Sequence, residues 1–79
     1  MRSAIDILDG QFLEMRWRCL SLAADLDRIQ RANGGSELLN NDMRLNKLRQ
    51  AVELLLTDTP GRAEKVQDIL SDKSPVKVP

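Results

Sequence analysis

The sequence contains no histidine and no tyrosine, and its one cysteine is Cys19. Without histidine, a nucleophilic thiol lacks its usual base, and a tetrahedral zinc site lacks imidazole as well as a second thiolate. One cysteine also excludes an intrachain disulfide, and a lone free thiol is typical of a reducing compartment. The composition therefore predicts a cytoplasmic protein that has no metal, no cofactor and no thiol-based catalysis.

Aromatic residues are nearly absent, with only Phe12 and Trp17 in 79 residues. Base stacking on an aromatic platform is therefore excluded. The 12 basic side chains balance the 12 acidic ones, whereas proteins that bind phosphate backbones carry a basic excess or a basic stripe. We predict no nucleic-acid partner. The alternative is a weak site on two basic helix faces, formed by Arg44, Lys47, Arg49, Arg62 and Lys65.

Long hydrophobic runs are also missing. Asp6 and Asp9 interrupt the apolar N-terminal segment, which therefore differs from a signal peptide, and no run reaches the length that spans a membrane. A chain of 79 residues is near the lower size limit for independent folding, since one core of this size supplies about 3–5 kcal/mol. With no disulfide or zinc to add stability, we predict self-association as a dimer.

The apolar residues that are present follow a heptad pattern, with spacings that alternate between three and four. This pattern predicts one long amphipathic helix over about residues 4–32. Ser3 is the expected N-cap and Asn33-Gly34-Gly35 the expected stop. We expect Cys19, which occupies one of these apolar heptad positions, to be a small buried residue. We name the a and d positions of the pattern the seam: Ile5, Leu8, Phe12, Met15, Cys19, Leu22, Leu26 and Ile29.

A second apolar stripe runs along the same segment at heptad positions b and f. It consists of Leu13, Trp17, Leu20 and Ala24, and we name it the Trp17 stripe. A tryptophan flanked by arginines has the composition of an interface hot spot. We therefore predict that the stripe, together with Arg16 and Arg18, forms the interface with a partner.

Two shorter helices are predicted over about residues 41–57 and 60–70. Thr59 is the expected cap of the last one and Pro60 its first residue. Together they roughly match the long helix in length. We therefore expect an all-α helical hairpin in which residues 41–57 return along the C-terminal half of the long helix and residues 60–70 continue beside its N-terminal half. Residues 1–71 would form one domain and residues 72–79 a flexible tail.

The beginning of the sequence carries a set of eight residues at characteristic spacings: Arg2, Ile5, Asp6, Asp9, Phe12, Leu13, Leu22 and Ala23. This set resembles the opening helix of the all-helical chorismate mutases. That family, however, holds its dianionic substrate with cations, and this chain has Cys19 and Gln30 at two positions where the pattern requires them. The resemblance therefore implies no activity here.

From the sequence we predict a non-catalytic protein–protein interaction or scaffold module, such as a small adaptor, accessory subunit or assembly part. It would act through its apolar helix faces as a coiled-coil-like antiparallel homodimer that forms a helical bundle with a core of four or more helices. The alternative partner is another protein, and no membrane is expected. The alternative function is a small ligand-binding protein or enzyme. Its polar site would form at an oligomer interface from Glu14, Arg16, Arg18 and Asp25.

Overall fold

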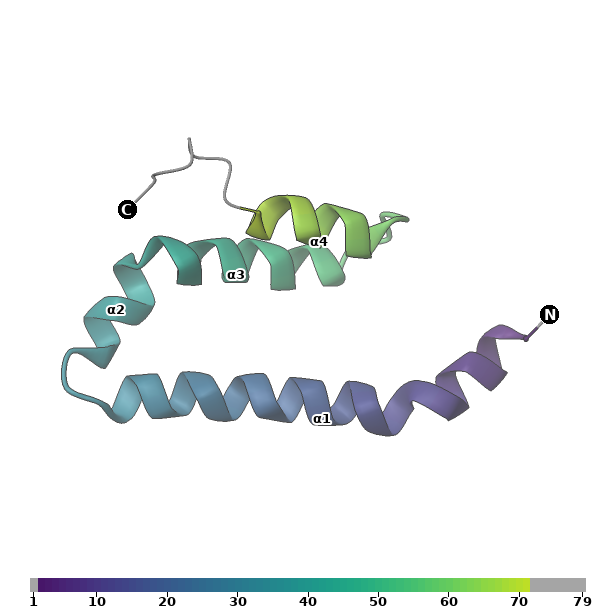
Figure 1. Ribbon diagram of the computed structural model, residues 1–79, viewed down its shortest axis with the longest axis horizontal. Coiled ribbons are helices and arrows are strands. Elements are labelled where there is room, and N and C mark those ends of the chain that lie inside the picture. Colours follow the sequence, from purple (N-terminus) through teal and green to yellow (C-terminus); the bar gives the residue numbers. More distant parts are fainter. Residues whose placement is uncertain (1, 72–79) are drawn as a thin grey trace, which may run out of the picture. The chain divides into compact units, whose positions relative to one another are not determined.

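The computed structural model describes residues 2–71 and is all-helical over that range, as predicted. Its helices are α1 (Ala4–Arg31), α2 (Gly35–Asn41), α3 (Met43–Leu55) and α4 (Arg62–Leu70) (Figure 1). The chain divides between Ser36 and Glu37 into two compact units. The predicted tail, 72–79, lies outside the described residues, and the single domain over 1–71 stays a prediction.

α1 begins at the predicted cap. The backbone N–H of Asp6 donates to Ser3 Oγ at 3.2 Å, and the backbone N–H of Ser3 donates to Asp6 Oδ2 at 3.4 Å. Two N–H groups that the helix start would leave unpaired are thereby satisfied. Asp6 in the first turn, with Arg28 and Arg31 in the last, also complements the helix dipole. The 28 residues make a rod of about 42 Å.

Two glycines form the turn after α1. Gly34 has φ of 79°, in the left-handed region that favours glycine. Gly35 packs directly on the end of α1, where a Cβ atom would lie 1.8 Å from the carbonyl oxygen of Ile29. The N–H of Gly35 donates to the Ala32 carbonyl at 3.0 Å. α1 therefore stops just before Asn33-Gly34-Gly35, where the sequence predicts its end.

α2, Gly35–Asn41, is a helix that the sequence did not predict. These seven residues are helical, and the N–H of Asp42 continues the pattern by donating to the Leu38 carbonyl at 2.9 Å. A helix of two turns contains too few apolar positions for its period to be visible in the sequence. Several residues suited to N-caps in the same stretch also favour a turn.

α3 begins next to Asp42, whose side chain accepts from the N–H groups of Arg44 at 2.8 Å and Leu45 at 3.4 Å. The helix ends near its predicted limit, where the hydroxyl of Thr57 donates to the Leu54 carbonyl at 2.7 Å. These two side chains pair backbone groups that the helix ends would otherwise leave unsatisfied.

α4 starts later than predicted. Its N-cap is Gly61, with φ of 75°, and it makes no side-chain capping bond. Thr59 does not cap α4; its N–H donates instead to Thr57 Oγ1 at 3.4 Å. Because the left-handed φ of Gly61 cannot belong to a right-handed helix, the first helical residue is Arg62 instead of Pro60.

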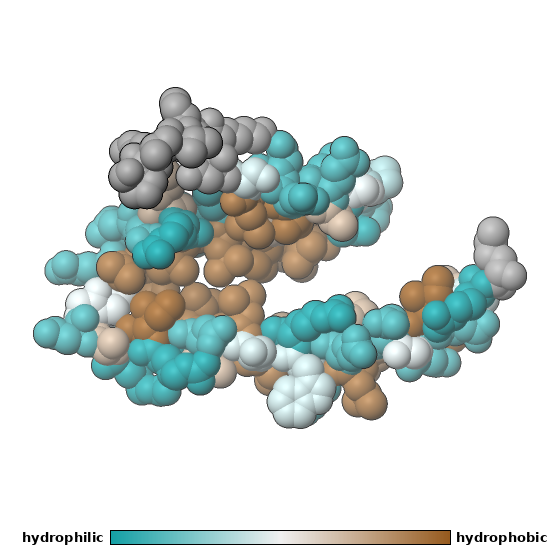
Figure 2. All heavy atoms as spheres, viewed as in Figure 1, coloured by the Kyte–Doolittle hydropathy of each residue, from teal (hydrophilic) through white to brown (hydrophobic). Residues whose placement is uncertain are grey.

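α3 and α4 pack against each other as an antiparallel pair (Figure 1). The expectation that residues 60–70 continue in the direction of the preceding helix is therefore wrong: the chain reverses between Leu55 and Arg62. Ala51 of α3 is 3% exposed, and Val66 and Ile69 of α4 are half-buried. In Figure 2 apolar atoms gather along this pair.

Candidate interaction surfaces of α1

None of the 28 residues of α1 is buried. The N-terminal half of the seam is exposed, with Ile5 at 59% and Phe12 at 54%. Cys19 is also exposed, which corrects its predicted place in a core. Further along the seam, Leu22, Leu26 and Ile29 are half-buried. The two halves of the seam therefore differ in how much apolar surface they leave in water.

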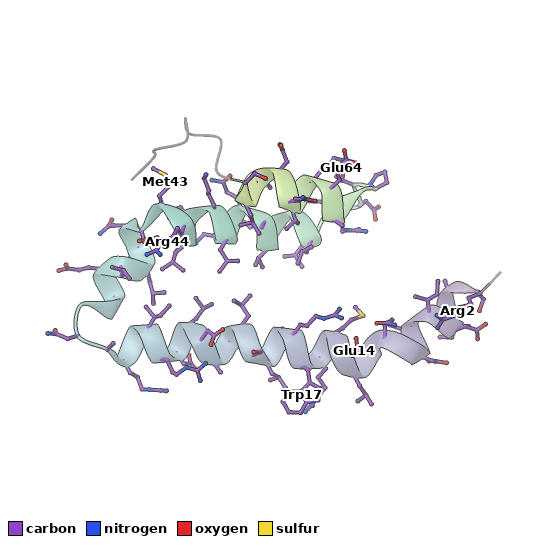
Figure 3. The ribbon with its side chains drawn as sticks, in the orientation of Figure 1. Arg2, Glu14, Trp17, Met43, Arg44 and Glu64 are labelled. Carbon is purple, nitrogen blue, oxygen red and sulfur yellow. The ribbon has the colours of Figure 1, made fainter. Side chains whose placement is uncertain are left out.

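The Trp17 stripe is exposed over most of its length. Leu13 is 70% and Trp17 is 65% exposed, Leu20 is also exposed, and Ala24 is half-buried. Figure 3 shows the Trp17 ring projecting away from the helix axis. Beside the ring lies a shallow open hollow, lined also by Arg18, Ser21, Leu22 and Asp25. α1 brings all the predicted stripe residues to its surface, in the order that helical spacing requires.

The charged residues of α1 are mostly engaged along the helix itself. Arg18 Nη2 lies 3.0 Å from Glu14 Oε2, and Arg28 pairs with Asp25. Three of the four residues proposed for a polar ligand site therefore already have local partners. Arg16, the fourth, has no ion pair within residues 2–71, and neither has Asp9.

Four of the five basic residues of the alternative nucleic-acid site also bind local partners. Arg44 pairs with Asp42 at 3.2 Å, and Arg49 Nη2 donates to the Leu39 carbonyl at 3.4 Å. Lys65 Nζ donates to the Pro60 carbonyl at 2.8 Å, and Arg62 donates to the Thr57 carbonyl. These cations bind a carboxylate or backbone carbonyls at helix ends and turns, so they are directed at local groups and do not converge on one ligand.

Asp42 is a carboxyl group whose surroundings shift its pKa. The hydrogen bond from the Arg44 guanidinium holds the pKa of Asp42 below its ordinary value, and the two backbone N–H donors act in the same direction. The same pairing raises the pKa of Arg44. This pair stabilises the start of α3.

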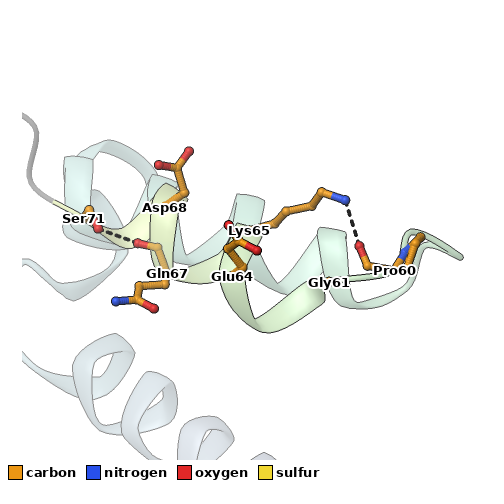
Figure 4. A pocket seen from close by; sticks show the side chains of 7 residues that line it. All are labelled: Pro60, Gly61, Glu64, Lys65, Gln67, Asp68 and Ser71. Atoms are coloured by element: carbon orange, nitrogen blue, oxygen red, sulfur yellow. Dashed lines mark hydrogen bonds between the residues drawn. The ribbon is translucent and has the colours of Figure 1, made fainter.

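A second hollow lies along α4 and is lined mainly by charged and polar residues (Figure 4). Glu64, Lys65, Gln67 and Asp68 line it, and the hydroxyl of Ser71 closes one end by donating to the Gln67 carbonyl at 2.6 Å. It is open to solvent, and it combines acidic and basic groups on one helix face. This is the composition of a solvated helix surface.

Neither a metal site nor a membrane span is found in the described part of the chain. Residues 2–71 contain no group of three or more Cys, Asp or Glu side chains arranged to hold a metal ion. In the same range, no helix combines the length and the hydropathy needed to cross a bilayer.

Heptad spacing predicted the helix that carries the seam and the Trp17 stripe, and their role as interfaces stays a prediction. The exposure of the N-terminal half of the seam was not predicted. That exposure depends on which segment covers a face, and heptad spacing carries no such information. Compared with known proteins, the chain matches no family model, no curated protein and no solved structure.

Proposed function

We propose that this protein is a non-catalytic protein–protein interaction module that works through α1 and self-associates as a dimer. One observation supports the proposal most strongly: a helix of 28 residues has no buried residue and exposes large apolar side chains on two faces. Contiguous exposed apolar surface marks interaction sites in soluble proteins.

The energetic reason is the free energy gained when such side chains leave water. Fully burying a leucine, methionine or phenylalanine side chain is worth about 1.5–3 kcal/mol relative to leaving it exposed. Leu8, Phe12 and Met15 are each close to half exposed or more. For a chain of 79 residues, burial of these residues in a dimer would add substantially to the small stability of a single core.

The proposal includes the predicted helical bundle. The positions Leu45, Leu48, Val52 and Leu55 repeat the spacing of the seam. On that pattern α3 returns along the C-terminal half of the seam within one chain, and a second copy covers apolar surface that remains. Two faces of α1 are available to the second copy, the N-terminal seam and the Trp17 stripe.

Sedimentation equilibrium on alanine variants tests the proposal and separates the two faces. Phe12→Ala probes the seam and Trp17→Ala the stripe; Ile7→Ala is the matched control, an exposed apolar residue of α1 outside both surfaces. At least one of the first two variants should weaken dimerisation by about 2 kcal/mol or more, the cost of losing a hot spot. The Ile7 variant should dimerise like the unmodified chain. Equal dimerisation in all three variants would contradict the proposal.

A further inference from the structure

We infer that the second copy pairs with the N-terminal half of the α1 seam in an antiparallel orientation, with Phe12 of each copy opposite Met15 of the other. This inference rests on the proposed self-association and specifies the surface, the orientation and the register. Its basis is the exposure of residues 5–19 of the seam combined with the placement of two charged residues, Asp9 and Arg16, beside it.

The register follows from the heptad positions. In an antiparallel pair each a residue lies opposite a d residue of the other helix. With Phe12 opposite Met15, Leu8 faces Cys19 and Ile5 faces Leu22 of the second copy. The layers cover the exposed part of the seam and end at Leu22, where the half-buried part begins. The central layers place a thioether against an aromatic ring, which is a favourable contact.

Charge complementarity selects this register. Residues at heptad position e flank the layers, and in an antiparallel pair they face e residues of the other helix. Asp9 and Arg16 both occupy e positions. In the proposed register Asp9 of each copy faces Arg16 of the other, and the two-fold axis repeats the pair. Neither residue has an ion pair within residues 2–71, so both are available.

The neighbouring antiparallel registers are less favourable. When the layers move by one heptad toward the C-terminal end of α1, Arg16 of one copy faces Arg16 of the other, and Arg18 faces Arg18. A shift by two heptads places Arg18 opposite Asp25, but these residues already pair with Glu14 and Arg28 within their own helix. That register also relies on Leu26 and Ile29, which are half-buried in the single chain.

A parallel in-register pair has no such charge complementarity. Its flanking contacts join position g of one helix to position e of the next heptad in the other. Arg16 would then face Gln11, and Arg18 would face Ala23. No oppositely charged residues meet along the seam in this arrangement, so the charges favour the antiparallel pair.

The antiparallel pair leaves the Trp17 stripe outside. Trp17 is at position f and Leu13 at position b, both away from the layers. Trp17→Ala should therefore change the dissociation constant of the dimer by less than about threefold, whereas Phe12→Ala should raise it by about thirtyfold or more, as expected for a hot spot.

Disulfide mapping tests the register directly, with Cys19 as one partner. In the proposed pair the two Cys19 residues are offset by eleven positions, or about 16 Å along the helices, too far for a disulfide. Leu8→Cys places a second thiol opposite Cys19 of the other copy. Mild oxidation should therefore cross-link the Leu8→Cys variant and leave the unmodified chain uncross-linked, as read by non-reducing electrophoresis and peptide mass mapping.

Two further variants report the competing arrangements. Met15→Cys would cross-link to Cys19 of the other copy in the register shifted by one heptad. Leu22→Cys would cross-link to Cys19 in the register shifted by two heptads. In a parallel pair, the two Cys19 residues of the unmodified chain would cross-link to each other. The inference is overturned if Met15→Cys, Leu22→Cys or the unmodified chain cross-links to a greater extent than Leu8→Cys. It is also overturned if the chain is a dimer but neither the unmodified chain nor any of the three variants cross-links. A chain that is monomeric by light scattering and never cross-links instead contradicts the proposed self-association itself.

Charge reversal gives an independent readout. Asp9→Arg alone or Arg16→Asp alone turns both flanking pairs into like-charge contacts, and each should raise the dissociation constant about tenfold. The double variant restores opposite charges and should return to within about threefold of the unmodified chain. Asp27→Arg, the same change at an exposed position off the seam, is the matched control. A double variant as weak as the singles would contradict the pairing.

Discussion

Asp42 shows how one side chain fixes the start of a helix. Ser36, Asn40, Asn41 and Asp42 are all residue types that cap helices. Asp42 is the residue that caps α3, and it also binds the Arg44 guanidinium. Spacing alone cannot choose among adjacent caps, because the choice depends on where the preceding helix ends.

The lowered pKa of Asp42 gives α3 an acid-sensitive start. A carboxyl whose pKa is lower in the folded chain contributes stability in full above its ordinary pKa, near 4. That contribution is lost as the pH falls through the lowered value. We therefore expect the unmodified chain to lose helicity below about pH 4 more steeply than Asp42→Asn, as measured by circular dichroism. Parallel acid profiles for the two chains would contradict this role.

Gly35 is a second residue whose role depends on one contact. Alanine there would place its Cβ against the Ile29 carbonyl oxygen, which is backbone and cannot move aside cheaply. We expect Gly35→Ala to destabilise the chain by about 1–3 kcal/mol in thermal unfolding. Gly10→Ala is the matched control: its Cβ meets only the flexible end of Arg2, and it should stabilise α1 by about 1 kcal/mol. Equal melting temperatures for the two variants would exclude this explanation.

Among the elements, α1 was the most predictable from sequence. Its heptad spacing, the Ser3 cap and the glycine-rich stop mark both ends, and the observed bounds agree with the predicted ones. α2 was not predicted, because two turns are too short to show a period. The reversal between α3 and α4 was also missed, because Pro60 and Gly61 mark a break in the helix but do not set the direction of the chain after it.

The α3–α4 pair makes a prediction at this scale. Ala51, at 3% exposure, is the most buried side chain of α3, and a small residue there lets a neighbouring helix approach closely. Ala51→Leu should lower the free energy of unfolding by about 1–3 kcal/mol through overpacking. Gln50→Leu introduces the same side chain at the adjacent exposed position and should change it by less than about 0.5 kcal/mol. Chemical denaturation of both variants measures the difference.

At the scale of the whole molecule, the sequence identified the candidate surfaces but not which one a second copy would use. Both the seam and the Trp17 stripe were evident from periodicity. The choice between them depends on which parts of the seam stay exposed and on which charges lack local partners. Asp9 and Arg16 illustrate this: their heptad positions are evident from sequence, whereas their availability follows only from the ion pairs of the other charged residues.

The molar mass of the unmodified chain in solution tests the central claim most directly. Light scattering over a wide range of concentrations should give twice the 8.9 kDa of one chain, with dissociation only at the lowest concentrations. A mass of 8.9 kDa at every concentration would contradict self-association through α1, and with it the proposed function and the antiparallel pair.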